Sequence, residues 1–105
     1  MPLNRFSRTE LLVGEVGLAV LARANVAVIG IGGVGSYTAE ALARAGVGKL
    51  TLVDYDDICL TNVNRQLHAL QSTLGQAKVE VMAARVKEIN PVSYTHLTLP
   101  TKRIV

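Results

Sequence analysis

The sequence predicts an α/β protein, the N-terminal half of a Rossmann-like doubly wound parallel sheet, with a helical N-terminal arm. Short β-branched segments alternate with helical ones in the order helix, strand, helix, strand, loop, helix. A glycine-rich turn follows the first strand, where sheets of this kind bind nucleotides. We therefore divide the chain into a helical arm (1–24), a truncated nucleotide-binding half-domain (25–91) and a tail (92–105).

The arm has apolar residues near helical spacing, interrupted by Gly14 and Gly17. This pattern predicts one helix or two short ones, with Ser7 or Thr9 as the N-terminal cap. The apolar positions are Leu11, Leu12, Val16, Leu18 and Leu21.

Two glycine-bounded β-branched runs, "NVAVIG" (25–30) and "KLTLVD" (49–54), predict strands buried on both faces. The segment between them reads as a helix that Gly46 ends. Residues 55–75 are polar and predict a long functional loop. After Gly75, "QAKVEVMAARVKEIN" predicts a helix whose apolar face holds Val79, Met82, Ala83, Val86 and Ile89.

Composition bounds the function only loosely. The formal charge is +3 over 105 residues, but Lys102 and Arg103 supply two of those charges. Residues 1–91 hold nine Lys and Arg against eight Asp and Glu, a net of +1, so the charge balance indicates no nucleic-acid surface. A single cysteine, Cys59, excludes an internal disulfide, and no apolar run is long enough to span a membrane. We expect a cytoplasmic protein.

Gly30-x-Gly32-x-x-Gly35 lies between a predicted strand and a predicted helix, and Asp54 closes the next strand. In this setting Gly30 allows the turn, Gly32 lets phosphate approach the backbone, and Gly35 lets helix and strand pack closely. Asp54 is placed to accept hydrogen bonds from ribose. The plainer alternative is a tight turn with Asp54 as a solvated acid, and the motif alone does not choose between ATP and a nicotinamide cofactor.

The polar loop favours ATP, because a guanidinium and an ammonium neutralise a triphosphate and a side-chain amide orients it. The residues of this type are Asn62, Asn64, Arg65, Gln66 and Lys78. Alternatively, Arg65 pairs with a nearby acid and Lys78 is a solvated helix residue. We expect Cys59 to be a small packed residue and His68 a hydrogen-bonded loop histidine rather than a metal ligand.

Four segments, "RFSRTELLVGEVGLAVL", "GIGGVGSYTAEALARAGVG", "LVDYDDICLTNVNRQ" and "GQAKVEVMAARVKEINP", together resemble the N-terminal part of the E1-like, ThiF/MoeB-type adenylating superfamily. The segments "NRQLHAL" and "RFSRTELLVG" are most similar to those of its tRNA threonylcarbamoyladenosine dehydratase branch. That resemblance implies an enzyme that uses ATP to activate the carboxylate of a threonylcarbamoyl group on tRNA, after which cyclisation follows. The sulfur-carrier branch, which adenylates the C-terminus of a ubiquitin-like protein and works with a cysteine desulfurase-type partner, is the alternative.

The resemblance also implies roles for single residues. Asp54 becomes the ribose acid, and Arg65 and Lys78 the triphosphate cations. Arg8 matches an arginine that reaches the ATP of the partner subunit in a homodimer, and Asp56 and Asn64 lie in the matching loop. The phosphate loop is Gly30, Gly32, Gly33 and Gly35. The family's magnesium-binding aspartate is expected beyond this fragment, which we therefore expect to be inactive alone.

The tail "VSYTHLTLPTKRIV" departs from the family. Its reverse translation permits codons that resemble the transposase mosaic-end adapter of sequencing libraries, so we interpret 92–105 as a translated adapter. A genuine divergent tail is the alternative. Two further readings of the whole chain remain open, a nicotinamide-dependent oxidoreductase and a non-catalytic nucleotide-binding module.

Overall fold

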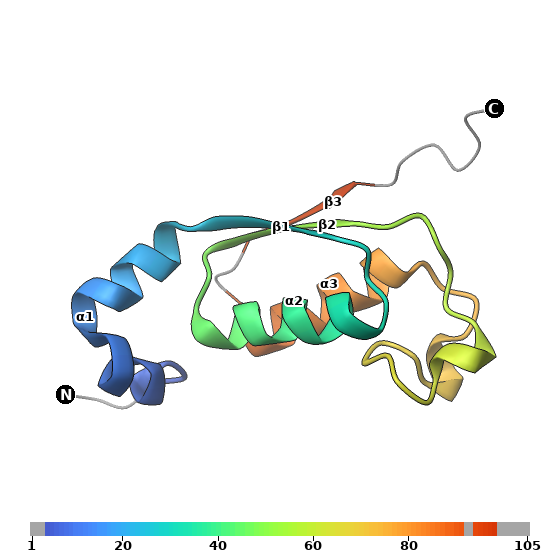
Figure 1. The fold of residues 1–105 in the computed structure, drawn as a ribbon, viewed down its shortest axis with the longest axis horizontal. Coiled ribbons are helices and arrows are strands. Elements are labelled where there is room, and N and C mark those ends of the chain that lie inside the picture. The colour runs from blue at the N-terminus through green and yellow to red at the C-terminus, as the bar shows by residue number, and fades with distance from the viewer. Residues whose placement is uncertain (1–3, 92–93, 99–105) are drawn as a thin grey trace.

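In the computed structural model, a parallel sheet lies over two helices and a third helix extends past one end of it (Figure 1). The structure describes residues 4–91 and the backbone of 94–98. The elements are α1 (Ser7–Arg23), β1 (Asn25–Ile29), α2 (Gly33–Ala45), β2 (Lys49–Val53), α3 (Lys78–Ile89) and β3 (Tyr94–Thr98), with 3-10 turns at Leu60–Asn62 and Gln71–Thr73.

The sheet has the strand order β1-β2-β3, and both pairs are parallel. Val26 lies opposite Leu50, and Leu50 lies opposite Thr95. Successive parallel strands need a long crossover connection, and here α2 lies between β1 and β2 and α3 lies between β2 and β3. The predicted fold class, part of a Rossmann-like parallel α/β sheet with a helical arm, is confirmed.

The core lies between the sheet and the paired helices α2 and α3. Leu50 and Leu52 of β2 are fully buried against it. The predicted apolar face of α3 is confirmed, since Val79, Met82, Ala83 and Val86 are buried and Ile89 packs against the same cluster. Gly46 ends α2 with φ +101°, the left-handed conformation expected of a helix C-cap.

The prediction that the first strand is buried on both faces is wrong. Asn25, Ala27 and Ile29 are exposed, and β2 alternates between buried and half-buried residues. A strand of a parallel sheet is buried on both faces only when helices cover both faces of the sheet. Here α2 and α3 lie on the same face of the sheet (Figure 1). The second strand also ends one residue early, at Val53, which leaves Asp54 in the turn that follows.

The arm is kinked at Gly14, whose φ of +76° and ψ of 174° interrupt the helix. Neither Ser7 nor Thr9 provides the N-terminal cap we predicted. The capping residue is Phe6, which makes no side-chain hydrogen bond to the helix. Asn4 closes the turn just before it, because its Oδ1 accepts a hydrogen bond from the N–H of Phe6 at 2.8 Å. Ser7 Oγ in turn accepts from the N–H of Asn4 at 2.8 Å, so the two side chains close the start of α1 reciprocally.

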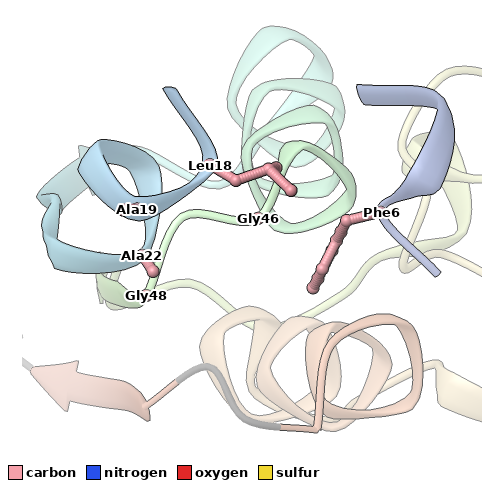
Figure 2. A pocket seen from close by; sticks show the side chains of 6 residues that line it. All are labelled: Phe6, Leu18, Ala19, Ala22, Gly46 and Gly48. Carbon is pink, nitrogen blue, oxygen red and sulfur yellow. The ribbon is translucent and has the colours of Figure 1, made fainter. Parts of the chain in front are cut away.

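The two ends of the arm attach to the amino-terminal edge of the sheet. Arg5 donates to the carbonyl of Ile89 at 2.6 Å, and the N–H of Gly48 donates to Leu21 O at 3.0 Å. Between these anchors lies an apolar groove of about 480 Å³, toward which Phe6 and Leu18 extend from opposite sides of Gly46 (Figure 2). Its lining residues are Phe6, Leu18, Ala19, Ala22, Gly46 and Gly48.

The interpretation of 92–105 as a translated adapter concerns mostly positions outside the described residues, namely 92–93 and 99–105. Tyr94–Thr98 form β3, which continues the parallel sheet beside β2. That pairing describes the conformation of the peptide and does not test the origin of its codons. The interpretation of the tail therefore stays a prediction.

Candidate nucleotide-binding site

The site begins at the turn between β1 and α2. Gly30 has a φ of +90°, which favours glycine, and its N–H donates to Val53 O at 2.8 Å. A Cβ atom on Gly35 would lie only 1.8 Å from the carbonyl oxygen of Gly30. The first turn of α2 therefore passes against the glycine turn at a distance that only glycine permits.

The N-terminus of α2 has the features of an anion site. The helix begins at Gly33, its capping residue Gly32 supplies no side-chain hydrogen bond, and its first turn holds no acidic residue. No acidic side chain of the helix itself therefore neutralises the positive end of its dipole. Backbone N–H groups in such a turn are suited to phosphate oxygens.

Asp54 joins the glycine turn to the end of β2. Its Oδ2 accepts from the N–H of Ile31 at 2.7 Å, and its Oδ1 accepts from the N–H of Asp56 at 2.8 Å. The carboxylate is half-buried and hydrogen-bonded to two backbone N–H groups, which argues against the alternative that Asp54 is simply a solvated loop acid. Each carboxylate oxygen has two lone pairs, so hydrogen bonds from ribose hydroxyls remain chemically compatible with these contacts. Asp56 is exposed, and its carbonyl accepts from the N–H of Lys78 at 3.1 Å.

Asn62 organises the loop rather than facing solvent. It is 8% exposed, and its Oδ1 accepts from the N–H of Cys59 at 2.8 Å. Its carbonyl also accepts from the N–H groups of Arg65 at 3.1 Å and Gln66 at 3.0 Å. One buried amide residue therefore sets the backbone of the segment that carries Arg65.

Arg65 and Gln66 lie over the glycine turn. The Cγ of Arg65 is 4.0 Å from the point where a Cβ on Gly33 would lie, and Nε2 of Gln66 is 3.8 Å from the corresponding point on Gly32. Exposed Arg65 donates to the carbonyl of Thr61 at 2.8 Å and to Oδ1 of the exposed Asn64 at 3.0 Å. Both acceptors are uncharged, which argues against the alternative that Arg65 is held by an acid.

Lys78 is the first residue of α3 and is only 7% exposed, so the alternative that it is a solvated helix residue is wrong. Its charge acts on His68, whose pKa lies below the ordinary value of 6.5. Burial is the largest cause of that lowering, and the Lys78 ammonium adds to it. The carbonyl of Ile31 and the charge of Asp54 oppose the shift. Lys78 and Asp54 therefore both lie within electrostatic reach of His68.

Gln66, already a candidate from the sequence, and His68 are both buried although they lie in an irregular polar loop. His68 is 1% exposed and its Nε2 lies 2.7 Å from the carbonyl oxygen of Ile31, so it is hydrogen-bonded as expected but lies inside the protein. Its Nδ1 and the Oε1 of Gln66 are buried and have no hydrogen-bond partner among the residues that the structure describes. The sequence does not predict their burial, because tertiary contacts decide which side chains of an irregular loop are covered.

Two other expectations have different outcomes. Cys59 is exposed, which corrects the prediction of a packed residue, because the chain buries Ile58 but leaves Leu60 69% exposed. Arg8 is exposed in the first turn of α1. This helix lies beyond the amino-terminal end of β1, whereas the glycine turn follows the carboxyl end of that strand (Figure 1). Within one chain, Arg8 does not join the site.

Within the part of the chain that the structure describes, no group of three or more His, Cys, Asp or Glu side chains is arranged to hold a metal ion. Among those same residues, no helix is both long and apolar enough to cross a membrane.

The geometry defines a glycine turn of the kind that binds phosphate in α/β proteins, and comparison with known proteins identifies the class of this chain. The profile of the ThiF family matches residues 6–99, so the chain belongs to that family. The tRNA threonylcarbamoyladenosine dehydratase of Bacillus subtilis (strain 168) is 62% identical over 89 residues, which cover 85% of this chain and 35% of that protein. The Escherichia coli (strain K12) protein of the same name is 58% identical over 88 residues, 84% of this chain and 33% of that protein.

The solved structures agree with this class. The crystal structure of the E. coli tRNA N6-threonylcarbamoyladenosine dehydratase in complex with ATP superimposes with a TM-score of 0.88 at 53% identity. The match covers 90% of this chain and 39% of that one. The chain thus spans about a third of the length of the curated relatives it matches. It is homologous to their ATP-binding region.

Proposed function

We propose that this chain is the ATP-binding portion of an enzyme that adenylates a carboxylate, and that the complete protein cyclises threonylcarbamoyladenosine in tRNA in the cytoplasm. The observation that carries the proposal is the position of Arg65 and Gln66 over a glycine turn whose Ile31 N–H is bonded to Asp54. The ATP complex of a 53% identical relative supports ATP over a nicotinamide cofactor.

The proposed roles follow from charge and position. Gly30, Gly32, Gly33 and Gly35 form the phosphate turn at the N-terminus of α2, and Asp54 accepts hydrogen bonds from the ribose. Arg65 and Lys78 neutralise the triphosphate. Because Lys78 is mostly buried, its ammonium gains little from solvent and favours a bound anion. Asp56 and Asn64 hold this set through backbone and side-chain hydrogen bonds.

The reaction requires positioning more than acid-base chemistry. A carboxylate oxygen of the threonylcarbamoyl group attacks the α-phosphorus of ATP, and the bond to the departing pyrophosphate breaks. The resulting acyl adenylate then loses AMP as the carbamoyl oxygen closes the ring on the activated carbonyl carbon, and the carbamoyl N–H releases its proton to water. Cations at the phosphates stabilise the charge that develops on the leaving pyrophosphate. Residues 4–91 hold no group of three His, Cys, Asp or Glu side chains suited to magnesium, so the aspartate that would bind this ion is expected outside them.

Arg8 fits this scheme only through a second subunit. Because it lies at the opposite end of the sheet from the glycine turn, we propose that it reaches the ATP of a partner in a homodimer of the complete protein. In such a dimer, a subunit with Arg8→Ala and one with Arg65→Ala form one intact site when mixed. Recovery of turnover on mixing two inactive variants supports this arrangement, and its absence contradicts it.

A chimera tests the proposed function. Residues 4–91 replace the matching segment of the E. coli dehydratase, which is 58% identical over 88 residues and supplies the remaining two thirds of the enzyme. We expect the chimera to form the cyclic modification on tRNA only when ATP is present. Asp54→Ala or Arg65→Ala in the chimera should each reduce turnover at least about tenfold, roughly 1.4 kcal/mol.

The controls separate the alternatives. If the chimera folds and binds ATP but adenylates only a sulfur-carrier protein, the sulfur-carrier assignment replaces ours. Preferential binding of NADH, unaffected by Arg65→Ala, would support an oxidoreductase. Unchanged turnover in both site variants would show that the site is wrongly assigned.

A further inference from the structure

We propose that His68 is a positioning residue that holds the phosphate-binding turn in shape by donating its Nε2–H to the carbonyl of Ile31. The contact measures 2.7 Å and is buried. The inference rests on the proposed function, because its consequence is read through the binding of phosphates. It concerns a residue to which neither the motif nor the charge argument above gives a role.

The turn needs such a support. Ile31 lies between Gly30 and Gly32, and glycine restricts the backbone less than any other residue. Ile31 is fully buried, its N–H is taken by Asp54 at 2.7 Å, and its carbonyl is taken by His68. Both polar groups of the central residue are thus fixed from two sides, by the end of β2 and by the loop.

A second contact holds the loop against α2. The N–H of Leu67 donates to Oγ of Ser36 at 3.3 Å, and Ser36 is fully buried in the first turn of the helix. His68 therefore does not approach Ile31 as a free side chain, because the residue before it is anchored to the helix that follows the turn. The same segment carries Gln66 over Gly32.

The chemistry of the contact fixes the tautomer. A carbonyl oxygen only accepts, so Nε2 must carry the hydrogen and Nδ1 of the neutral ring must be bare. The buried Nδ1 has no partner among the described residues. Protonation would place a second hydrogen there without an acceptor, in a buried setting beside the Lys78 ammonium. The charge of Asp54 and the carbonyl of Ile31 act in the opposite direction. The lowered pKa of His68 accords with a ring kept neutral.

This role predicts a selective defect. The turn faces phosphate, whereas the ribose contact belongs to Asp54, so loss of the His68 hydrogen bond should weaken ATP more than adenosine. His68→Phe keeps an aromatic ring but removes the donor, leaving a buried carbonyl unsatisfied. His68→Gln keeps a donor at nearly the same reach. Asn90→Ala is the matched control, because Asn90 is 1% exposed, donates to two backbone carbonyls and lies at the far end of α3.

The first experiment measures dissociation constants of ATP and adenosine for the 105-residue chain and its variants. We expect His68→Phe to reduce the preference for ATP over adenosine about tenfold, and His68→Gln to recover most of it. Asn90→Ala should leave the preference unchanged even where it lowers the melting temperature. An unchanged preference in His68→Phe, or an equal loss in Asn90→Ala, overturns the proposal.

The second experiment does not depend on ATP. Nitrogen NMR of the imidazole rings, with a His96→Gln variant used to separate His68 from His96, the other histidine of the chain, reports tautomer and charge directly. At pH 6.5, where a histidine of ordinary pKa is half protonated, we expect His68 to be mostly neutral with its hydrogen on Nε2. A charged ring, or hydrogen on Nδ1, overturns the proposal even if His68→Phe fails to fold. If the wild-type chain prefers adenosine or NADH to ATP while the tautomer is as expected, the proposed function fails and the phosphate role of His68 fails with it, but the contact stands.

Discussion

The two ends of the sheet differ in how they use polar groups. At the carboxyl ends of the strands, buried polar side chains gather around the glycine turn, and main-chain groups bind to them. At the amino ends, α1 buries no residue and borders an apolar groove (Figure 2). The buried polar residues of the first end are Ser36, Asn62, Gln66, His68 and Lys78, and the second end holds Asn90.

The difference teaches where this fold accepts a cost in stability. A buried polar atom without a partner is unfavourable, and such atoms call for an explanation in a native structure. Two of the three such atoms in the described chain, Gln66 Oε1 and His68 Nδ1, lie beside the glycine turn, and the third is Asn90 Oδ1. Local departures from the best packing tend to coincide with functional sites, which is consistent with a preorganised phosphate site at this end.

Gly35→Ala should have the largest effect, because the new Cβ would lie 1.8 Å from the backbone oxygen of Gly30. We expect a loss of about 3 kcal/mol in the free energy of unfolding, measured by urea denaturation. Gly32→Ala is the matched control, since its Cβ would meet only Gln66 Nε2 at 3.8 Å. It should change stability by less than about 1 kcal/mol while weakening ATP binding. Equal stability losses in the two variants would contradict the close packing at Gly35.

Removal of a phosphate cation should have the next largest effect. Arg65→Ala and Lys78→Ala should each weaken ATP binding about tenfold, roughly 1.4 kcal/mol, with little change for adenosine. Arg23→Ala removes the same charge from the last turn of α1, at the other end of the sheet, and should leave both constants unchanged. If all three variants weaken ATP binding equally, the effect is one of net charge. That outcome would contradict a phosphate site at the carboxyl end of the sheet.

The sequence predicted the elements better than their surroundings. Periodicity and glycine placement located α2, α3, β1 and β2 within a few residues, because these signals are local. They did not reveal that Ile29 is 80% exposed, since the coverage of a sheet face depends on helices distant in sequence. At the site, spacing identified Asp54 and Lys78 as candidates. The burial of His68 and Gln66 was not predictable, because it arises when the loop folds onto the glycine turn.

The pH dependence of stability should distinguish the two ends more finely. Because the folded pKa of His68 is lowered from 6.5, the unfolded chain binds a proton more readily. Above pH 6.5 the ionisation of His68 therefore has little effect on the free energy of unfolding. Below pH 6.5 this free energy falls as the pH drops toward the lower pKa of the folded state. His68→Phe should flatten this part of the profile, whereas Asn90→Ala should not. Glu40, whose pKa Arg85 lowers, adds a separate loss only below about pH 4.5. An unaltered slope in His68→Phe would contradict a neutral buried ring.

The smallest effect is expected at the apolar face of the arm. Leu11 and Leu12 are 84% and 88% exposed, so Leu11→Ser and Leu12→Ser remove no buried contact within one chain. Each should change the free energy of unfolding of the monomer by less than about 0.5 kcal/mol. Leu52→Ala, in the fully buried part of β2, should cost about 2 to 5 kcal/mol. A large stability loss that grows with protein concentration would show that this face is covered by a second copy. A loss independent of concentration would instead show that the arm packs within its own chain, against the contrast drawn between the two ends of the sheet.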